Sequence, residues 1–181
     1  MSIMTLGLSE YMDFTSYMDD LIKTIQANTT GDSFIISYEE FLAGYSALDD
    51  LACVYILYNT LRKAAYVGSS SNLRKRLVEH FGKGRDGFKK SRNSNPPLQR
   101  AIGVDGKECF DIIVPEVIPY ASNLTAQDLR RRLNARENYY LRVLYPTGRL
   151  YNISRRSNKR DVPADRFNNR TLYNTRYIPR K

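Results

Sequence analysis

Residues 51–82 constrain the fold most, because they contain two strand-like runs, a turn between them and the start of a helix. The two runs, Leu-Ala-Cys-Val-Tyr-Ile-Leu-Tyr and Ala-Ala-Tyr-Val-Gly, are apolar and rich in Val, Ile and Tyr. They flank a polar turn at residues 59–62, and this order is typical of a β-hairpin. The second run ends at Gly68. A helix is then expected to start close to Asn72, which can cap it.

Four polar side chains of this stretch are expected to lie close together. Arg76 and His80 are four residues apart, so they share one helix face beside the apolar stripe. This face leans back toward the hairpin, which carries Tyr55 and Tyr66. A strand tyrosine is usually a packing residue, and a histidine on a helix flank is usually solvated or structural. The joint spacing is what makes the four residues a candidate site.

The rest of the chain supplies two more helices and another strand. Asn95-Pro96-Pro97 favours a helix start, since proline is tolerated in the first turn. The segment 109–118 is dense in Ile, Val and Phe and fits a buried strand next to the hairpin. Thr125 to Asp128 resembles a capping box ahead of a long helix through Leu144. The order hairpin, helix, helix, strand, long helix predicts an α+β fold.

Glu137 interrupts the apolar stripe of the long helix. That stripe consists of Leu129, Leu133, Tyr140, Leu141 and Leu144. A buried carboxylate without compensation is costly, so Glu137 must be paired, hydrogen-bonded or bound to a cation. A structural ion pair with Arg136 or Arg76 and a functional role are both open at this point.

The charge of the chain is unevenly distributed and predicts a polyanionic partner. The net charge is +9, but residues 1–50 contain nine acidic residues and one basic residue, Lys23. Residues 51–181 therefore hold 27 of the 28 basic and ten of the 19 acidic residues. Nucleic acid is the commonest partner of such a basic body. A merely well-solvated surface would interleave the two signs.

Composition argues against a membrane protein and against a disulfide-rich one. No apolar run approaches the roughly 18 residues of a membrane-spanning helix. The first residues lack the basic region of a secretory signal and the Arg-rich character of a transit peptide. Cys53 and Cys109 lie in apolar strand-like runs, which is typical of buried free thiols.

The two ends of the chain are predicted to be extensions of a domain at residues 51–155. Residues 1–50 are acidic and expected to be partly helical, with an amphipathic helix at 10–27 and a short helix around 38–48. This arm is expected either to dock on the domain or to bind another protein, and it can also cover the nucleic-acid surface. Residues 156–181 form an Arg-rich tail that is expected to order only on a nucleic acid or a larger assembly.

Six sequence elements together resemble the GIY-YIG nuclease family. Cys53-Val54-Tyr55 stands where the family has Gly-Ile-Tyr, and Tyr66-Val67-Gly68 matches its Tyr-Ile-Gly element. The remaining four elements are Arg76, His80, Arg136-Glu137-Asn138 and Tyr151-Asn152-Ile153. The similarity covers about residues 51–155. Six elements in the right order make a chance match improbable.

The resemblance implies a fold and a set of catalytic roles. The family's fold is a small three-stranded sheet, mixed and mainly antiparallel, flanked by helices. The implied chemistry is metal-dependent hydrolysis of a phosphodiester. The implied catalytic residues are Tyr55 and His80, which position or deprotonate water, Tyr66 and Arg76, which contact the phosphate, and Asn152, which holds the hydrogen bonds of the site. Glu137 would bind one divalent cation, and Mg²⁺ is expected there.

Basic residues around this site are expected to bind nucleic acid. They lie on the first helix, in the loop after it and at the start of the tail: Arg74, Lys75, Lys83, Arg85, Lys89, Lys90, Arg92, Arg155, Arg156, Lys159 and Arg160. Several intron-encoded members carry a further histidine in that loop, whereas residues 90–95 contain none and Asn93 is the suggested replacement. Homing members of the family normally have a long C-terminal region that recognises DNA, whereas this sequence has only a short basic tail in that place.

Two functions follow from these observations. The first is a metal-dependent DNA endonuclease of the intron-encoded, homing type. The second is a family member that no longer cleaves and serves as an RNA-binding structural component of a ribonucleoprotein, such as a mitochondrial ribosome. A mitochondrial location of an organelle-encoded protein is suspected, and the absence of a transit peptide does not exclude it, because such a protein needs none. An intracellular, non-secreted protein is the other expectation.

Overall fold

The fold is built on one antiparallel sheet. The computed structural model describes residues 13–27, 31–82, 95–119 and 121–153. The sheet has the strand order β1-β4-β2-β3, and all its strand pairs are antiparallel. Its strands are β1 (Phe34–Ile36), β2 (Cys53–Asn59), β3 (Ala64–Ser70) and β4 (Phe110–Val117). The α-helices of the described residues are α1 (Phe14–Ala27), α2 (Tyr38–Leu42), α3 (Leu73–Phe81), α4 (Pro96–Asp105) and α5 (Ala126–Leu144).

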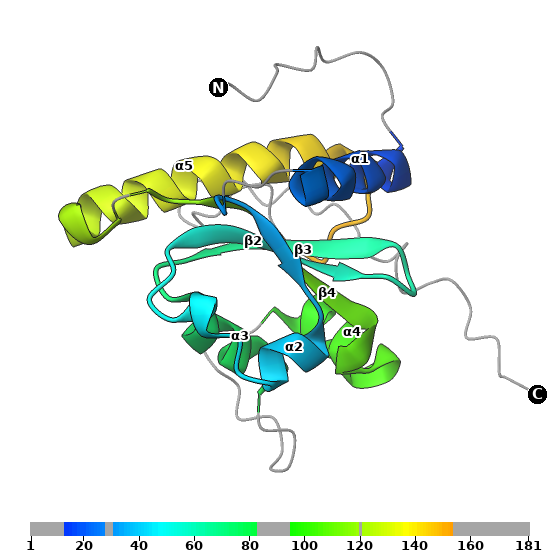
Figure 1. The fold of residues 1–181 in the computed structure, drawn as a ribbon. Helices are drawn as coiled ribbons and strands as arrows, with labels where there is room; N and C mark the ends of the chain where they lie inside the picture. The colour runs from blue at the N-terminus through cyan, green and yellow to red at the C-terminus, as the bar shows by residue number, and fades with distance from the viewer. Residues whose placement is uncertain (1–12, 28–30, 83–94, 120, 154–181) are drawn as a thin grey trace, which may run out of the picture.

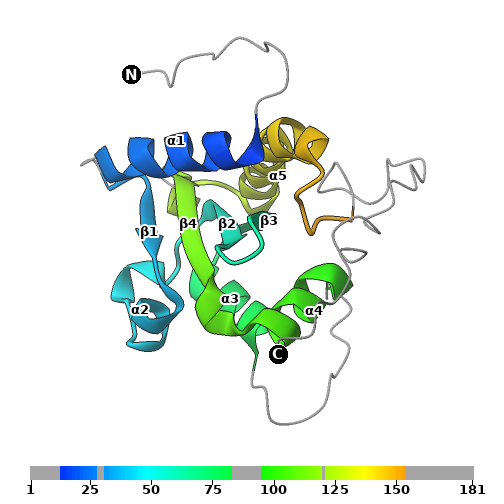
Figure 2. The same ribbon diagram turned by 90° about the vertical axis from the view of Figure 1, so that its right-hand side faces the viewer.

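Helices cover both faces of the sheet. The helices α1 and α5 lie on one face, and α2, α3 and α4 lie on the other (Figures 1 and 2). Each face has its own apolar core, to which α3 contributes Leu77 and α5 contributes Leu141. The strand β2 runs between the two cores and all its residues are buried. This explains why the sequence of β2 is a continuous apolar run rather than an alternating one.

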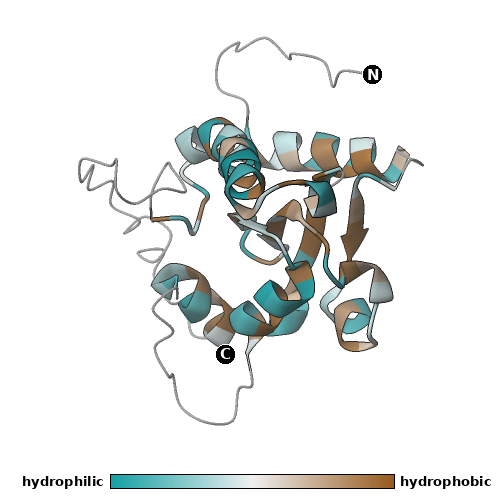
Figure 3. Cartoon of the chain, turned by 90° about the vertical axis from the view of Figure 1, so that its left-hand side faces the viewer, coloured by the Kyte–Doolittle hydropathy of each residue, from teal (hydrophilic) through white to brown (hydrophobic). Residues whose placement is uncertain are grey.

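Alternation along β2 distributes its side chains between the two faces. Tyr55 and Leu57 belong to the core beneath α3 and α4, whereas Val54 and Ile56 belong to the core beneath α1 and α5. The strands and the helix sides that face them are largely hydrophobic (Figure 3). No helix of the described residues is long and apolar enough to cross a membrane.

The turn between β2 and β3 is fixed by a buried amide. The side-chain oxygen of Asn59 accepts hydrogen bonds from the backbone N–H groups of Leu61 and Arg62, at 3.1 and 3.0 Å. Its side-chain nitrogen donates to Oδ2 of Asp105 over 2.8 Å and to the hydroxyl of Tyr151 over 3.1 Å. Asp105 in turn forms an ion pair with Arg62. The network ties the hairpin turn to α4 and to the segment after α5.

The helices begin where the capping residues of the sequence indicate. Asn72 caps α3 by accepting from the backbone N–H of Lys75, and Asn95 caps α4, whose first residues are prolines. Thr125 caps α5, and its hydroxyl also bonds to the Asp128 carboxylate over 2.6 Å. These caps confirm the helix starts predicted from the sequence.

The α+β architecture is confirmed, with one strand more than the three expected. The additional strand, β1, pairs with β4 at one edge of the sheet. The short helix expected around residues 38–48 is divided into α2 and a separate turn of 3₁₀-helix at Ser46–Leu48. An isolated parallel bridge between Ala65 and Leu150 brings the segment after α5 alongside β3.

The acidic N-terminal segment packs on the rest of the fold. Phe14, Met18 and Ile25 of α1 are buried in the same core as β2 and α5. Of the two expectations for this segment, docking is therefore what its described part does, and nothing supports a protein partner for it. The division of the chain at residues 50 and 155 stays a prediction.

The two thiols are both free. Cys53 is buried in β2, and Cys109 is half-buried with its Sγ donating to the carbonyl of Asp105 over 3.1 Å. The expectation of free thiols is confirmed, although only Cys53 is fully enclosed.

Candidate active site

The hydroxyl of Tyr55 is the meeting point of the candidate site. It lies 2.7 Å from Nε2 of His80. Nε of Arg76 donates a hydrogen bond to the same oxygen over 3.2 Å. Arg76 and His80 are one helical turn apart on α3, which packs against the hairpin. The structure thus brings together the strand and helix residues that the four-residue spacing predicted.

The hydroxyl of Tyr55 is held between an obligate donor, Arg76, and a histidine. Arginine has only donor groups, so the oxygen of Tyr55 must accept from Arg76. The hydroxyl proton can be donated to Nε2 of His80 when the neutral ring carries its own proton on Nδ1, and in the other tautomer Nε2–H donates to the hydroxyl. Burial is the main cause that raises the pKa of Tyr55 well above its ordinary value. The arrangement therefore keeps Tyr55 protonated and within hydrogen-bond distance of His80.

His80 should make the stability of the fold depend on pH. Burial, followed by the charge of Arg76, lowers the pKa of His80 from 6.5 to about 3. The unfolded chain therefore binds a proton at a higher pH than the folded chain, and the free energy of unfolding falls as pH drops from 6.5 toward 3. This amounts to about 2 kcal/mol between pH 7 and pH 5. Chemical denaturation at pH 7 and pH 5 should show that the free energy of unfolding falls less in His80→Gln than in wild type. An equal fall in both proteins would contradict the buried neutral histidine.

Tyr66 lies beside this cluster and nearer the surface. Its ring is 5.1 Å from that of His80, edge-on, and 6.2 Å from that of Tyr55. Tyr66 is 9% exposed, whereas Tyr55 is 0% exposed. Burial is again the main cause that raises the pKa of Tyr66. Of the two tyrosines, Tyr66 is therefore the less deeply buried.

Gly68 provides the space in which the two tyrosines approach the backbone. A Cβ atom at this position would lie 2.5 Å from Cζ of Tyr55 and 2.9 Å from Cε1 of Tyr66. Real Cβ contacts are not this short, so any side chain at residue 68 would displace the rings. The glycine of the Tyr-Val-Gly element is thus required by packing rather than by backbone conformation.

Asn152 bonds to the backbone of the edge strand. Its Oδ1 accepts from the N–H of Val67 and its Nδ2 donates to the carbonyl of Val67, both at 2.8 Å. Tyr151 also donates its backbone N–H to the carbonyl of Ala65 over 2.7 Å. Asn152 therefore holds β3 between Tyr66 and Gly68.

Glu137 approaches the end of β3 from the opposite face of the sheet. Its Oε2 accepts a hydrogen bond from the hydroxyl of Ser69 over 2.6 Å. Arg136, one candidate partner, pairs instead with Glu116, at 2.6 Å. Arg76, the other candidate, pairs with Glu79 at 2.7 Å. Burial raises the pKa of Glu137, while the Ser69 hydrogen bond and the charge of Arg76 oppose that rise.

The partner of Glu137 was not predicted from the sequence. The candidate partners were two arginines, whereas the hydroxyl that reaches this carboxylate belongs to Ser69, 68 positions away in the chain. The position of Ser69 directly after the Tyr-Val-Gly element was the available signal. It places a hydroxyl where the strand leaves the two tyrosines.

The basic residues expected to bind nucleic acid are only partly described. Arg74 is engaged by the carboxylate of Asp49 and donates to the carbonyl of Tyr45 over 2.5 Å, whereas Lys75 is exposed. The other predicted residues lie outside the described residues: Lys83, Arg85, Lys89, Lys90, Arg92, Arg155, Arg156, Lys159 and Arg160.

Comparison with known proteins identifies the family of this chain. Intron-associated endonuclease 1 of Enterobacteria phage T4 is 31% identical over 101 residues, which are 56% of this chain and 36% of that protein. The match thus spans about a third of the length of this relative. Among solved structures, a mutant form of the catalytic domain of intron endonuclease I-TevI is 30% identical with a TM-score of 0.43, covering 57% of this chain and 94% of that chain. The family model described as the GIY-YIG catalytic domain matches residues 51–152, more than half of the sequence, and the chain therefore belongs to the GIY-YIG family.

Proposed function

We propose that this chain is an endonuclease that hydrolyses phosphodiester bonds of DNA with the help of a divalent cation at Glu137, in the manner of an intron-associated enzyme. The observation that carries the proposal is the convergence of Arg76 and His80 on the buried hydroxyl of Tyr55 in β2, with the Glu137 carboxylate at the end of the neighbouring strand β3. Family membership and the similarity to an intron-associated endonuclease support it.

Arg76 is the proposed contact to the phosphate that is cleaved. Its side chain is 22% exposed, so one side of the guanidinium is open to a ligand while Nε is held by Tyr55. Contact with Tyr55 and Glu79 raises the pKa of Arg76 against the opposing effect of burial. The guanidinium therefore stays charged and can stabilise the negative charge that develops on the phosphate.

Tyr55 and His80 are proposed to orient this arginine and to hold a proton. Tyr55 is fully buried, so it acts through its two partners rather than by facing solvent. Tyr66, the less buried ring, is proposed to meet the phosphate or the attacking water. A phosphate beside Arg76 would offset the positive charge that contributes to the lowered pKa of His80. Substrate binding would thereby make His80 a better proton acceptor.

Glu137 fits the ligand chemistry of Mg²⁺. Carboxylate oxygens are the ligands this ion prefers, and Mg²⁺ commonly keeps several waters and binds through one or two carboxylates plus substrate phosphates. The described residues contain no cluster of three or more His, Cys, Asp or Glu side chains that could enclose an ion. A single protein ligand, oriented by Ser69, is in keeping with that mode. When bound, the ion would polarise the phosphate and promote ionisation of a water.

Cleavage of supercoiled plasmid tests the proposal. Wild-type protein with Mg²⁺ should nick the plasmid, and EDTA should stop the reaction. Arg76→Ala should reduce the rate by roughly a hundredfold or more, as loss of one charge-stabilising donor does in other enzymes. Arg132→Ala, which removes an exposed arginine of α5, is the matched control and should cleave like wild type. A folded wild-type protein that nicks nothing with Mg²⁺ or Mn²⁺ would refute the endonuclease.

A further inference from the structure

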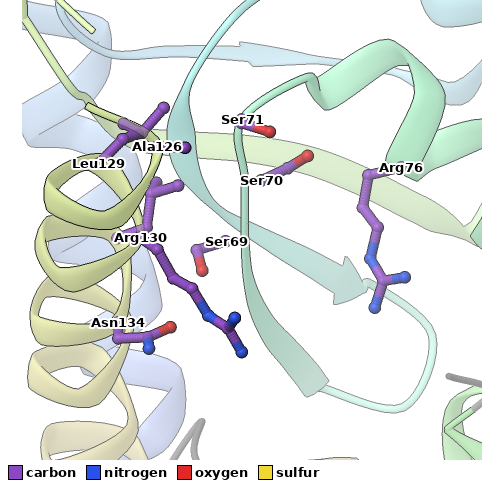
Figure 4. A pocket seen from close by; sticks show the side chains of 9 residues that line it. Ser69, Ser70, Ser71, Arg76, Ala126, Leu129, Arg130 and Asn134 are labelled. Carbon is purple, nitrogen blue, oxygen red and sulfur yellow. The ribbon is translucent and has the colours of Figure 1, made fainter. Parts of the chain in front are cut away.

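A groove of about 490 Å³ lies between the end of β3 and the first half of α5 (Figure 4). Its β3 side is formed by Ser69, Ser70 and Ser71, with Arg76 beyond them, and its α5 side includes Arg130 and Asn134. The groove borders both the Glu137 carboxylate and the cluster around the Tyr55 hydroxyl, each through one lining residue. Ser69 donates to Glu137, and Arg76 donates to Tyr55.

The α5 side of the groove and Glu137 belong to one helix face. Arg130, Asn134 and Glu137 follow one another at spacings of four and three residues, which places them on neighbouring turns of the same side. Seven residues separate Arg130 from Glu137, or roughly 10 Å along the helix axis. A ligand that reaches from Glu137 into the groove would therefore meet Arg130 next.

The groove has the chemistry of an anion site. Its lining contains two arginines and no acidic residue, together with hydroxyl and amide donors. Arg76 already has Glu79 as a partner. Arg130 is exposed and forms no ion pair with any other described residue. Figure 4 shows the guanidinium of Arg130 extending from α5 toward β3.

We propose that this groove binds a second phosphate of the DNA strand, flanking the phosphate that is cleaved, and that Arg130 and Asn134 hold it. The proposal rests on the proposed endonuclease function, because continuity with Arg76 and Glu137 is what selects a nucleic-acid backbone as the anion. Arginine binds phosphate oxygens through paired N–H groups, and an asparagine amide can add a further donor. Such a contact fixes the register of the strand without reading its bases.

Arg132 offers a matched control on the same helix. It is also exposed and lies two residues further along α5, which turns it about 200° away from Arg130. The substitutions Arg130→Ala and Arg132→Ala remove the same charge, so a general effect of net charge would be equal in both. Neither side chain is part of the core, and both variants should keep the unfolding midpoint of wild type.

Fluorescence anisotropy of a labelled DNA oligonucleotide in EDTA measures this site without cleavage. The full chain carrying Arg130→Ala should bind roughly tenfold more weakly than wild type, as expected for loss of one charge-assisted contact. The slope of log K against log salt should become shallower by about 0.7 to 0.9. Arg132→Ala should bind like wild type. Asn134→Asp, which adds a repelling charge, should weaken binding more than Asn134→Ala.

Cleavage assays separate this site from the proposed catalytic residues. Arg130→Ala should raise KM and leave kcat close to wild type, since the contact is not to the reacting phosphate. Equal losses of affinity in Arg130→Ala and Arg132→Ala, or a loss confined to kcat, would overturn the phosphate site. If wild-type protein cleaved no DNA but Arg130→Ala still lost DNA affinity and Arg132→Ala did not, the phosphate site would be upheld. Only the endonuclease function would then be refuted.

Discussion

Glu137→Gln should lose cleavage by at least roughly a hundredfold, because changes that only touch the surroundings of a metal ligand already cost 10- to 100-fold. Glutamine keeps the shape of the side chain and can still accept the hydrogen bond from Ser69. It lacks the negative charge with which a carboxylate attracts Mg²⁺. Rates of plasmid nicking over a series of Mg²⁺ concentrations would measure the effect.

The same substitution should stabilise the fold, which separates a metal ligand from a structural ion pair. Burial raises the pKa of Glu137, so its ionised form is less favourable in the folded protein than in the unfolded chain. Above the raised pKa this difference lowers the free energy of unfolding, and a neutral glutamine removes it. Denaturant titration near neutral pH without metal should therefore show a higher midpoint for Glu137→Gln.

Asp19→Asn is the control for this experiment. Asp19 is an exposed carboxylate of α1, so its loss changes the net charge equally without touching the site. It should leave cleavage and stability unchanged. Lower stability of Glu137→Gln would instead indicate that the carboxylate is a structural partner of Ser69, and unchanged cleavage would exclude Glu137 as the metal ligand.

Gly68→Ala should destabilise the fold by about 1–3 kcal/mol, the usual cost of overfilling a packed core, and should also abolish cleavage. The new methyl group would press on the rings of Tyr55 and Tyr66. Tyr55 is enclosed on all sides, so its ring cannot retreat without moving its hydroxyl away from Arg76 and His80. Denaturant midpoints and nicking rates would record the two effects.

Gly103→Ala provides the matched control. Gly103 lies in α4, and a Cβ there would meet no atom within 4 Å. Alanine in a helix is more favourable than glycine by roughly 0.5–1 kcal/mol, so this variant should be more stable than wild type. If both glycine substitutions changed stability in the same direction, contact with the tyrosines would not be the cause.

A double substitution tests whether positions 55 and 68 are coupled through this contact. Tyr55→Phe alone should destabilise the protein, because it leaves Arg76 and His80 without their buried partner. In the Gly68→Ala background the same change removes one of the two Tyr55 atoms that crowd the new methyl group and leaves Cζ in place, so its cost should be only partly reduced. Additive effects in the double-mutant cycle would show that the two positions act independently.

The parts of the fold that were predictable have strong local signals. The hairpin of β2 and β3 has apolar runs on both sides of a polar turn, and the turn is closed by Asn59, a residue suited to that task. The helices α3, α4 and α5 each start at a capping side chain. Four-residue spacing was enough to bring Arg76 and His80 to one hydroxyl, because helix geometry alone determines that face.

The parts that were not predictable depend on distant contacts. The strand β1 has three residues, and its pairing with β4 is what makes it a strand. The choice of Ser69 over two arginines as the partner of Glu137 depends on how α5 crosses β3, which no local pattern encodes. The groove beside Arg130 likewise exists only once these two elements are packed together.

The bonds between Asn152 and Val67 have a consequence for the whole molecule as well as for the site. β3 is the outermost strand on its side of the sheet, and an uncovered outer strand is a template on which another chain can assemble. Here the segment around residues 149–152 occupies those backbone groups, with the amide of Asn152 taking the place of a further strand residue. A molecule in which this segment has moved away would lose its active geometry and expose an aggregation-prone edge in the same event.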